Sequence, residues 1–242
     1  MQLEDYVFGG YFVTQRIARP PWMSAELLPA RLLTASNCIA SFVPDAWTFQ
    51  WTRVAQEERL QTADTLGIRP EELPALVKQV TEAENADSFG WPNVVTSEKA
   101  LVELAHILPS SPEWVVLGLG LHRENCASFL KKNAPTRGGG AAGVHEMVTQ
   151  SLGLPLGGTF IGFEPLAFEP GLPPHSWLCN GLETKCFQSL GIRPAPNGLL
   201  ATEDDAVRAN THIAHLAHEG GAEPAQWLPW MMLDYTGALW SA

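Results

Sequence analysis

The apolar run from Trp114 to Leu121 constrains the fold of this 242-residue chain more than any other segment. It contains only Trp, Val, Leu and Gly, so no polar side chain marks a face exposed to solvent. A half-buried strand alternates polar and apolar residues, whereas a short continuous apolar run is typical of a buried strand. The sequence therefore predicts a buried strand at 114–121, which the rest of the chain has to cover.

Helix-forming segments surround this strand in the sequence. Thr202 is a suitable N-cap, because its hydroxyl can accept a hydrogen bond from a backbone N–H of the first turn, and Gly220-Gly221 would end that helix. Thr96-Ser97-Glu98 marks another helix start, which Pro109 would stop. The predicted helices cover 53–65, a segment opening at Pro70, 98–108, 123–132, 142–152 and 203–218.

Other segments have the composition of strands. Trp47, Phe49 and Trp51 alternate with polar residues, as in a half-buried strand, and 159–168 is rich in apolar and aromatic residues. Gly9-Gly10 is expected to form a turn between short strands. Strands and helices do not alternate strictly, so the predicted class is α+β, with mixed α/β left open, built on a central sheet with flanking helices.

The length fits one domain covering residues 1–242. Apolar residues make up 45% of the chain, which is enough to build a sizeable core. The stretch from Pro135 to Gly140 is rich in Pro and Gly and predicts a flexible break. If the chain consists of two subdomains, they are expected to divide near 133–141.

The charge balance restricts the partners of the protein. Asp and Glu number 26 against 15 Lys and Arg, which gives a formal net charge of −11. Nucleic acids and anionic membranes both attract clustered basic side chains, and the basic groups here are few: Lys131-Lys132 with Arg137, and Arg16 with Arg19. The sequence therefore predicts neither a nucleic-acid nor a membrane partner, and a basic protein fits its charge better.

Cysteine use and the N-terminus predict a cytoplasmic protein. The four cysteines, Cys38, Cys126, Cys179 and Cys186, form no CxxC pair. The first residues lack the basic and apolar regions of a signal peptide, and no apolar run approaches the ~20 residues of a membrane span. Free and mostly buried thiols in a reducing compartment are the expected state.

Cys126 is the strongest candidate for catalysis. The predicted helix 123–132 places it in the first turn, where the helix dipole lowers the pKa of a thiol. His122, His145 or His175 could then serve as the base that a nucleophilic cysteine needs. A packed, inert cysteine is the favoured interpretation of this residue, and a cysteine-dependent hydrolase or transferase using Cys126 is the alternative function.

The histidine series His212, His215 and His218 suggests a metal site but fits one poorly. On a helix, residues three apart can share a metal, whereas a third residue at a spacing of six points away. Cys179 and Cys186 lie farther apart than the two to four residues usual between zinc-binding cysteines. A solvated histidine face opposite Ala206, Ala209 and Ile213 is predicted instead, with no metal and no cofactor. Gly118-Leu119-Gly120 and Gly138-Gly139-Gly140 lack the remaining residues of nucleotide-binding motifs.

Acidic and aromatic residues supply the candidate partner contacts. Glu203, Asp204 and Asp205 would occupy the first turn of a helix, where acids complement the helix dipole and could also meet a basic partner. Trp177, Trp227 and Trp230 are core residues by default, with interface anchoring as the alternative.

The C-terminal half carries a series of motifs in a fixed order. They are Phe160-Ile161-Gly162-Phe163-Glu164, His175 to Glu183, Asn197-Gly198-Leu199-Leu200, Glu223-Pro224, Trp227, Pro229 and Trp230. Gly9-Gly10-Tyr11-Phe12 and the run from Trp114 to Gly120 add to the pattern. In these motifs the chain resembles bacterial cytosolic immunity proteins of polymorphic or contact-dependent toxin systems. Toxin systems that use type VI secretion belong to this group. The resemblance covers most of the chain and singles out no subfamily.

This resemblance implies a non-enzymatic inhibitor that binds one cognate toxin domain and occludes it. The acidic charge fits a basic toxin such as a nuclease, because opposite charges raise the rate of association. The residues expected to contact the partner are Trp177, Glu183, Glu203, Asp204 and Asp205.

Overall fold

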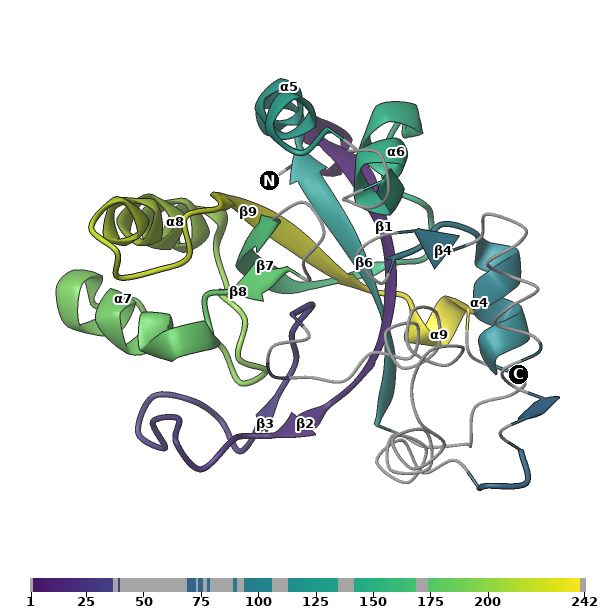
Figure 1. The fold of residues 1–242 in the computed structure, drawn as a ribbon, viewed down its shortest axis with the longest axis horizontal. Coiled ribbons are helices and arrows are strands. Elements are labelled where there is room, and N and C mark those ends of the chain that lie inside the picture. The colour runs from purple at the N-terminus through teal and green to yellow at the C-terminus, as the bar shows by residue number, and fades with distance from the viewer. Residues whose placement is uncertain are drawn as a thin grey trace.

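A computed structural model of the chain describes residues 2–36, 39, 69–72, 74–75, 78, 89–90, 94–105, 113–134, 142–168 and 174–239. These residues form a curled antiparallel sheet with helices packed around it (Figure 1). The predicted α+β class with a central sheet and flanking helices is confirmed. Strands from both sides of the segment 133–141 belong to this one sheet.

Among the described residues, the main sheet has seven strands, and four long ones form its middle. In spatial order they are β4 (Phe89–Gly90), β5 (Val94–Val95), β1 (Tyr6–Gln15), β6 (Trp114–His122), β9 (Gln226–Asp234), β7 (Thr159–Phe168) and β8 (His175–Ser176). A second, two-stranded sheet consists of β2 (Ile17–Ala18) and β3 (Arg31–Leu32).

The described helices lie around this sheet. They are α4 (Glu98–Ala105), α5 (Arg123–Lys132), α6 (Ala142–Gln150), α7 (Leu182–Leu190), α8 (Glu203–His218) and α9 (Thr236–Leu239), with short 3-10 helices η1 (Leu3–Asp5) and η2 (Cys179–Gly181). None of the helices in the described ranges combines the length and the apolar character needed to cross a lipid bilayer.

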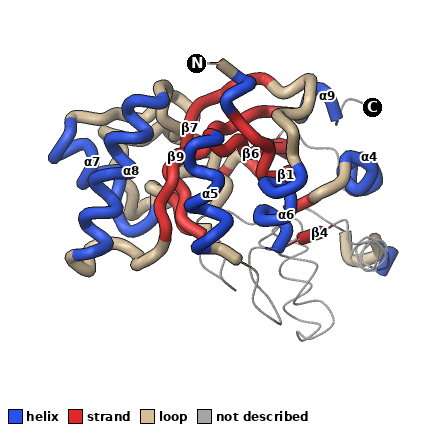
Figure 2. Tube along the Cα trace, turned by 90° about the horizontal axis from the view of Figure 1, so that it is seen from above, coloured by secondary structure: helices blue, strands red, loops and turns tan. Residues whose placement is uncertain are grey.

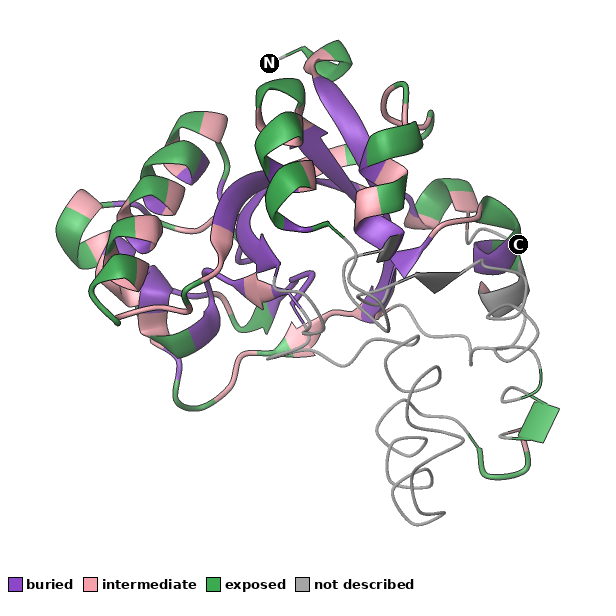
Figure 3. Ribbon diagram, turned by 45° about the horizontal axis from the view of Figure 1, so that its top comes forward, coloured by how far each residue is buried: buried purple, intermediate pink, exposed green. Residues whose placement is uncertain are grey.

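The sheet is buried on both faces, because α7 and α8 cover one side while α5 and α6 cover the other (Figure 2). Strand β6 shows why its sequence is continuously apolar. Val116 packs into the core beneath α7 and α8, whereas Val115 and Leu117 pack into the core beneath α5 and α6. Figure 3 shows the buried strands between largely exposed outer helix faces.

Several predicted elements are confirmed to within a residue or two. They are the strands at 114–121 and 159–168 and the helices at 123–132, 142–152 and 203–218. Thr202 caps α8 as expected, since its Oγ1 accepts a hydrogen bond from the backbone N–H of Asp205 at 3.2 Å. The helix after Thr96-Ser97 is confirmed as α4, whose described extent ends at Ala105.

The predicted turn at Gly9-Gly10 is wrong, because both glycines lie inside the ten-residue strand β1. The pairing of β1 with β6 shifts by one residue between Phe8 and Gly10, which is a β-bulge. Gly10 has a φ of +112°, and a Cβ on it would lie 2.2 Å from Cγ1 of Val94. The glycine pair therefore bends a strand locally and does not reverse the chain.

The sequence-based prediction lacked several elements, of which helix α7 and strand β9 are the longest. The predicted helices at 53–65 and from Pro70 onward, the alternating strand at 47–51 and the break at 135–140 lie wholly or mostly outside the described residues.

Candidate interaction surface

Tyr6 marks the end of the sheet at which three helix starts meet. It is opposite His122 in the β1–β6 ladder, and the two rings make an edge-to-face contact with centroids 5.2 Å apart. Helix α5 begins directly after His122, and Nε of Arg123 donates a hydrogen bond to the carbonyl oxygen of Glu4 in η1 at 2.9 Å. Burial and then the nearby carboxylate of Glu203 raise the pKa of Tyr6 well above its ordinary value, which places the start of α8 at the same end.

Six carboxylates gather at this end, and we call them the acidic end. They are Glu4, Asp5, Glu124, Glu203, Asp204 and Asp205. All six lie in helix first turns, where the helix dipole favours negative charge. The side chains of Glu124 and Asp204 are 87% and 82% exposed.

Two arginines lie among these carboxylates. Nη1 of Arg208 lies 3.1 Å from Oδ1 of Asp205 and 3.9 Å from Oδ2 of Asp204. Arg123 donates hydrogen bonds to backbone carbonyl oxygens, including that of Leu152 through Nη2 at 2.6 Å. Carboxylates therefore outnumber the guanidinium groups at the acidic end, and its local charge is negative.

Apolar side chains are exposed next to this negative charge. Leu3 directly precedes Glu4 and is 50% exposed, and Leu152, which Arg123 joins to η1, is 92% exposed. Val207 is also exposed and lies one turn beyond Glu203 on α8. Exposed apolar residues within a charged rim are the arrangement found at many protein–protein interfaces.

The structure divides the five predicted contact residues into two groups. Glu203, Asp204 and Asp205 belong to the acidic end. Trp177 and Glu183 are buried, with 0% and 2% of their surface exposed, so neither side chain is presented to a partner in this fold. Trp177 packs in the core beneath α7 and α8, and burial raises the pKa of Glu183.

Sequence reasoning missed three members of the acidic end, namely Glu4, Asp5 and Glu124. Two of them lie close to the N-terminus and one near the middle of the chain, and the register of β1 against β6 brings them together. The sequence did offer one signal for them: Glu4 and Asp5 come directly before strand β1, and Glu124 comes shortly after strand β6.

Cys126 lies where the sequence predicted, in the first turn of α5, but the lowered thiol pKa that the catalytic alternative needs is not found. Burial raises the pKa of its thiol, and this outweighs the opposing influence of Arg123. Sγ of Cys126 donates a hydrogen bond to the carbonyl oxygen of His122 at 3.6 Å. A raised pKa favours the neutral thiol over the nucleophilic thiolate.

The histidines proposed as bases for Cys126 have other neighbours. Nδ1 of His122 accepts a hydrogen bond from the backbone of Glu124, and Nε2 of His145 lies 3.2 Å from the carbonyl oxygen of Leu130. Nδ1 of His175 lies 3.8 Å from Oε1 of Glu223. The geometry therefore gives no support to the alternative function as a cysteine-dependent hydrolase or transferase.

Cys126 is expected to react slowly with iodoacetamide in the folded protein at pH 7. Its rate should be at least about fivefold below that of glutathione, because the raised pKa reduces the thiolate fraction and the side chain is half-buried. Mass spectrometry of the peptide containing Cys126 measures the rate, and the urea-unfolded chain gives the rate of the unprotected thiol. Labelling of native Cys126 faster than glutathione would contradict this prediction.

The histidine series lies along α8 as predicted, opposite the buried Ala206, Ala209 and Ile213. Nε2 of His215 pairs with Oε1 of Glu219 at 3.4 Å, whereas His212 departs from the predicted solvated face because its Nε2 is buried. Within the described residues, no three His, Cys, Asp or Glu side chains are grouped so that they could hold a metal ion. Cys126, Cys179 and Cys186 are in no disulfide.

Glu164 forms a buried polar cluster that the sequence did not reveal. This carboxyl group on β7 is fully buried, and its Oε1 accepts hydrogen bonds from the hydroxyls of Thr34 and Ser176, both at 2.5 Å. Oε2 accepts a hydrogen bond from the backbone N–H of Ala35 at 2.9 Å. Burial raises the pKa of Glu164 to about 7, and these hydrogen bonds oppose the rise. The cluster joins the segment after β3 to β7 and β8.

A cleft with a volume of about 620 Å³ lies where the C-terminal ends of α5 and α8 meet the end of β7 and the start of β9. Its walls combine apolar residues with a few polar ones. The lining residues are Lys132, Asn133, Phe168, Ala214, Ala217, His218, Pro224, Ala225, Gln226 and Trp227.

Comparison of the chain with protein-family models, with curated proteins and with solved structures found no match in any of the three. The resemblance to immunity proteins is therefore still a prediction.

Proposed function

We propose that this protein is a cytoplasmic, non-enzymatic immunity protein that binds and occludes a cognate bacterial toxin domain with a basic surface. The observation that carries the proposal is the acidic end, where η1, α5 and α8 supply six carboxylates and the exposed Leu3 and Leu152 lie beside η1 and α5. The net charge of −11 has the same sign as this surface. Opposite fields on two proteins accelerate their encounter and disfavour acidic competitors.

Carboxylates and apolar residues have separate tasks in this proposal. An exposed ion pair contributes only about 0–1 kcal/mol, so the carboxylates chiefly steer the toxin toward the surface. Affinity has to come from apolar contacts that exclude water, and Leu3 and Leu152 are suitably placed to make them. Blocking the toxin in this way requires neither a cofactor nor a covalent step.

The proposal is tested with a variant that removes three charges from the acidic end, Glu4→Gln with Glu124→Gln and Asp204→Asn. All three side chains are exposed, so the fold should persist. With the toxin domain encoded beside this gene, we expect the association rate at low salt to fall about tenfold or more. Stopped-flow fluorescence measures the rate, and added salt should reduce the difference between variant and wild type.

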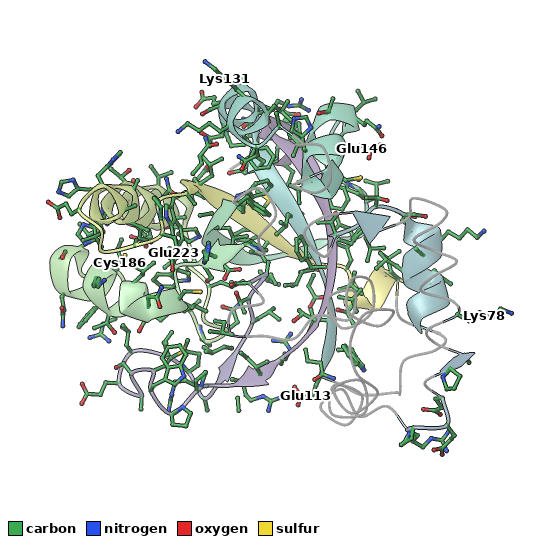
Figure 4. All side chains as sticks on the ribbon, in the orientation of Figure 1. Lys78, Glu113, Lys131, Glu146, Cys186 and Glu223 are labelled. Carbon is green, nitrogen blue, oxygen red and sulfur yellow. The ribbon has the colours of Figure 1, made fainter. Side chains whose placement is uncertain are left out.

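The matched control removes three exposed carboxylates elsewhere, with Glu26→Gln, Glu71→Gln and Glu146→Gln. Figure 4 shows Glu146 pointing outward from α6. This control changes the net charge equally, so its association rate should stay within about twofold of wild type if location matters. An equal loss in both variants would reject the acidic end as the contact surface. No heat of binding at micromolar concentrations, together with no rescue of growth, would reject the immunity function itself.

A further inference from the structure

The cleft between the ends of α5 and α8 has the composition of a small-molecule site. Phe168 and Trp227 form an aromatic part of its wall, and Ala214, Ala217 and Pro224 add aliphatic surface. Binding sites for small ligands typically measure about 300–1,000 Å³ and combine apolar walls with a few polar groups. The volume of about 620 Å³ falls within this range.

The walls of the cleft are held in place by hydrogen bonds. Nδ2 of Asn133 donates to Oε1 of Gln226 at 3.2 Å, and Nε2 of Gln226 donates to Oγ of Ser128 at 2.8 Å. Nε1 of Trp227 donates to the carbonyl oxygen of Glu223 at 3.1 Å. These bonds tie the start of β9 to α5 and to the segment after α8, so the cleft is formed before any ligand arrives.

Lys132 differs from most basic residues of the protein. Among the described lysines and arginines, only Lys131 and Lys132 have side chains without a hydrogen bond, ion pair or ring contact. Lys131 points outward from α5 into solvent (Figure 4), whereas Lys132 lines the cleft. Lys132 is exposed to solvent and brings a positive charge to the cleft.

Capping of α5 does not require Lys132. Lysines in a last helical turn can complement the carbonyl groups left free there. In α5, however, the carbonyl oxygen of Phe129 already accepts hydrogen bonds from the backbone N–H of Asn133 at 2.9 Å and from its Nδ2 at 3.1 Å. The charge of Lys132 is therefore available to a ligand.

We propose that this cleft binds a small organic anion, with an apolar body the size of one or two aromatic rings and one negatively charged end. Lys132 pairs with the charged end, and His218, which lines the cleft from the end of α8, can supply a second nitrogen donor. The body packs against Phe168, Trp227 and the alanines of α8. This site is separate from the acidic end and does not depend on the proposed immunity function.

Two fluorescent probes with similar aromatic bodies test the proposal. Anilinonaphthalene sulfonate carries one negative charge, and phenylnaphthylamine carries none. Titration of the full chain with each probe should give saturable binding of the anion at one site, with a dissociation constant at least about fivefold lower than that of the neutral probe. Backbone amide NMR shifts should change at Ala214, Ala217 and Gln226 and stay constant at Asp204.

The neighbouring lysines provide matched variants. Lys132→Gln should weaken binding of the anionic probe about fivefold or more, while Lys131→Gln, which removes the same charge one residue away, should change it less than twofold. Ala214→Leu should fill part of the cleft and reduce the affinity for both probes. Circular dichroism checks that each variant is folded.

Tighter binding of the anionic probe, its loss in Lys132→Gln but not in Lys131→Gln, and NMR shifts confined to the cleft would support the proposal. Equal effects of the two lysine variants would mean that the probe responds to general surface charge, and an unchanged affinity in folded Ala214→Leu would place the probe elsewhere. Either result, or tighter binding of the neutral probe, overturns the assignment.

Discussion

Gly162→Ala is expected to lower the free energy of unfolding by about 3 kcal/mol or more. Gly162 lies at the β-bulge of β7, where the register against β9 shifts between Phe160 and Gly162. Its φ is +143°, a backbone conformation that residues with a side chain rarely adopt. A Cβ there would also lie 2.8 Å from the carbonyl oxygen of Leu200 and 2.8 Å from Cβ of Leu199.

The clash involves backbone, so it cannot be relieved by rotating a side chain. Leu200 and Phe163 exchange two backbone hydrogen bonds, of 2.7 and 2.8 Å, and moving Leu200 away would strain both. Leu199 and Leu200 are buried, which leaves little room for such a movement. The backbone strain and the loss of packing therefore both lower the free energy of unfolding.

Urea unfolding followed by tryptophan fluorescence measures the loss. Gly153→Ala is the matched control, because a Cβ at Gly153 would meet nothing within 4 Å and its φ is not in the left-handed region. We expect this control to change stability by less than about 1 kcal/mol. Replacing glycine by alanine also restricts the unfolded chain, which by itself stabilises a protein slightly. A similar loss in both variants would therefore contradict the assignment of the effect to the bulge.

The bulge illustrates where the sequence was informative and where it was not. The strand 159–168 and the helix 203–218 could be predicted because their signals are local: composition in one and the Thr202 cap in the other. The register shift at Gly162 depends on where Leu199 and Leu200 come to lie, which no local pattern specifies. For the same reason Gly9-Gly10 was predicted as a turn and is a bulge.

Strand β9, which was not predicted, contains Pro229. Proline lacks a backbone N–H and is normally confined to edge strands. Here Pro229 lies opposite Pro165 of β7, whose carbonyl oxygen accepts a hydrogen bond from the backbone N–H of Trp177, away from β9. The two prolines therefore form a pair that needs no hydrogen bonds between them. The β6–β9 ladder starts at Leu121 and Trp230, just beyond Pro229.

The candidate site was predictable only in part. Glu203, Asp204 and Asp205 were found from their position at a helix start, but Trp177 and Glu183, the other two proposed contacts, are buried. Buried polar clusters are harder still to predict. Thr34 and Glu164 are 130 residues apart in the sequence, so their hydrogen bond follows from the sheet topology.

Glu164 leads to the second large effect, a loss of stability as the pH rises. In the folded protein the pKa of Glu164 is about 7, whereas the ordinary value is 4.5. Between these two pH values the folded protein holds a proton that the unfolded chain releases. The contribution of Glu164 to stability is therefore fully present below pH 4.5 and is lost as the pH rises to about 7. The full change corresponds to about 3 kcal/mol.

The Glu164→Gln variant isolates this contribution, because other titrating groups contribute equally to both proteins. The free energy of unfolding of wild type minus that of Glu164→Gln should fall by about 3 kcal/mol between pH 4.5 and pH 8. Glu146→Gln, which removes an exposed carboxylate, should show no such trend. A difference that stayed constant with pH would mean that Glu164 is ionised throughout. The hydrogen bonds from Thr34, Ser176 and Ala35 would then outweigh the cost of burying its charge.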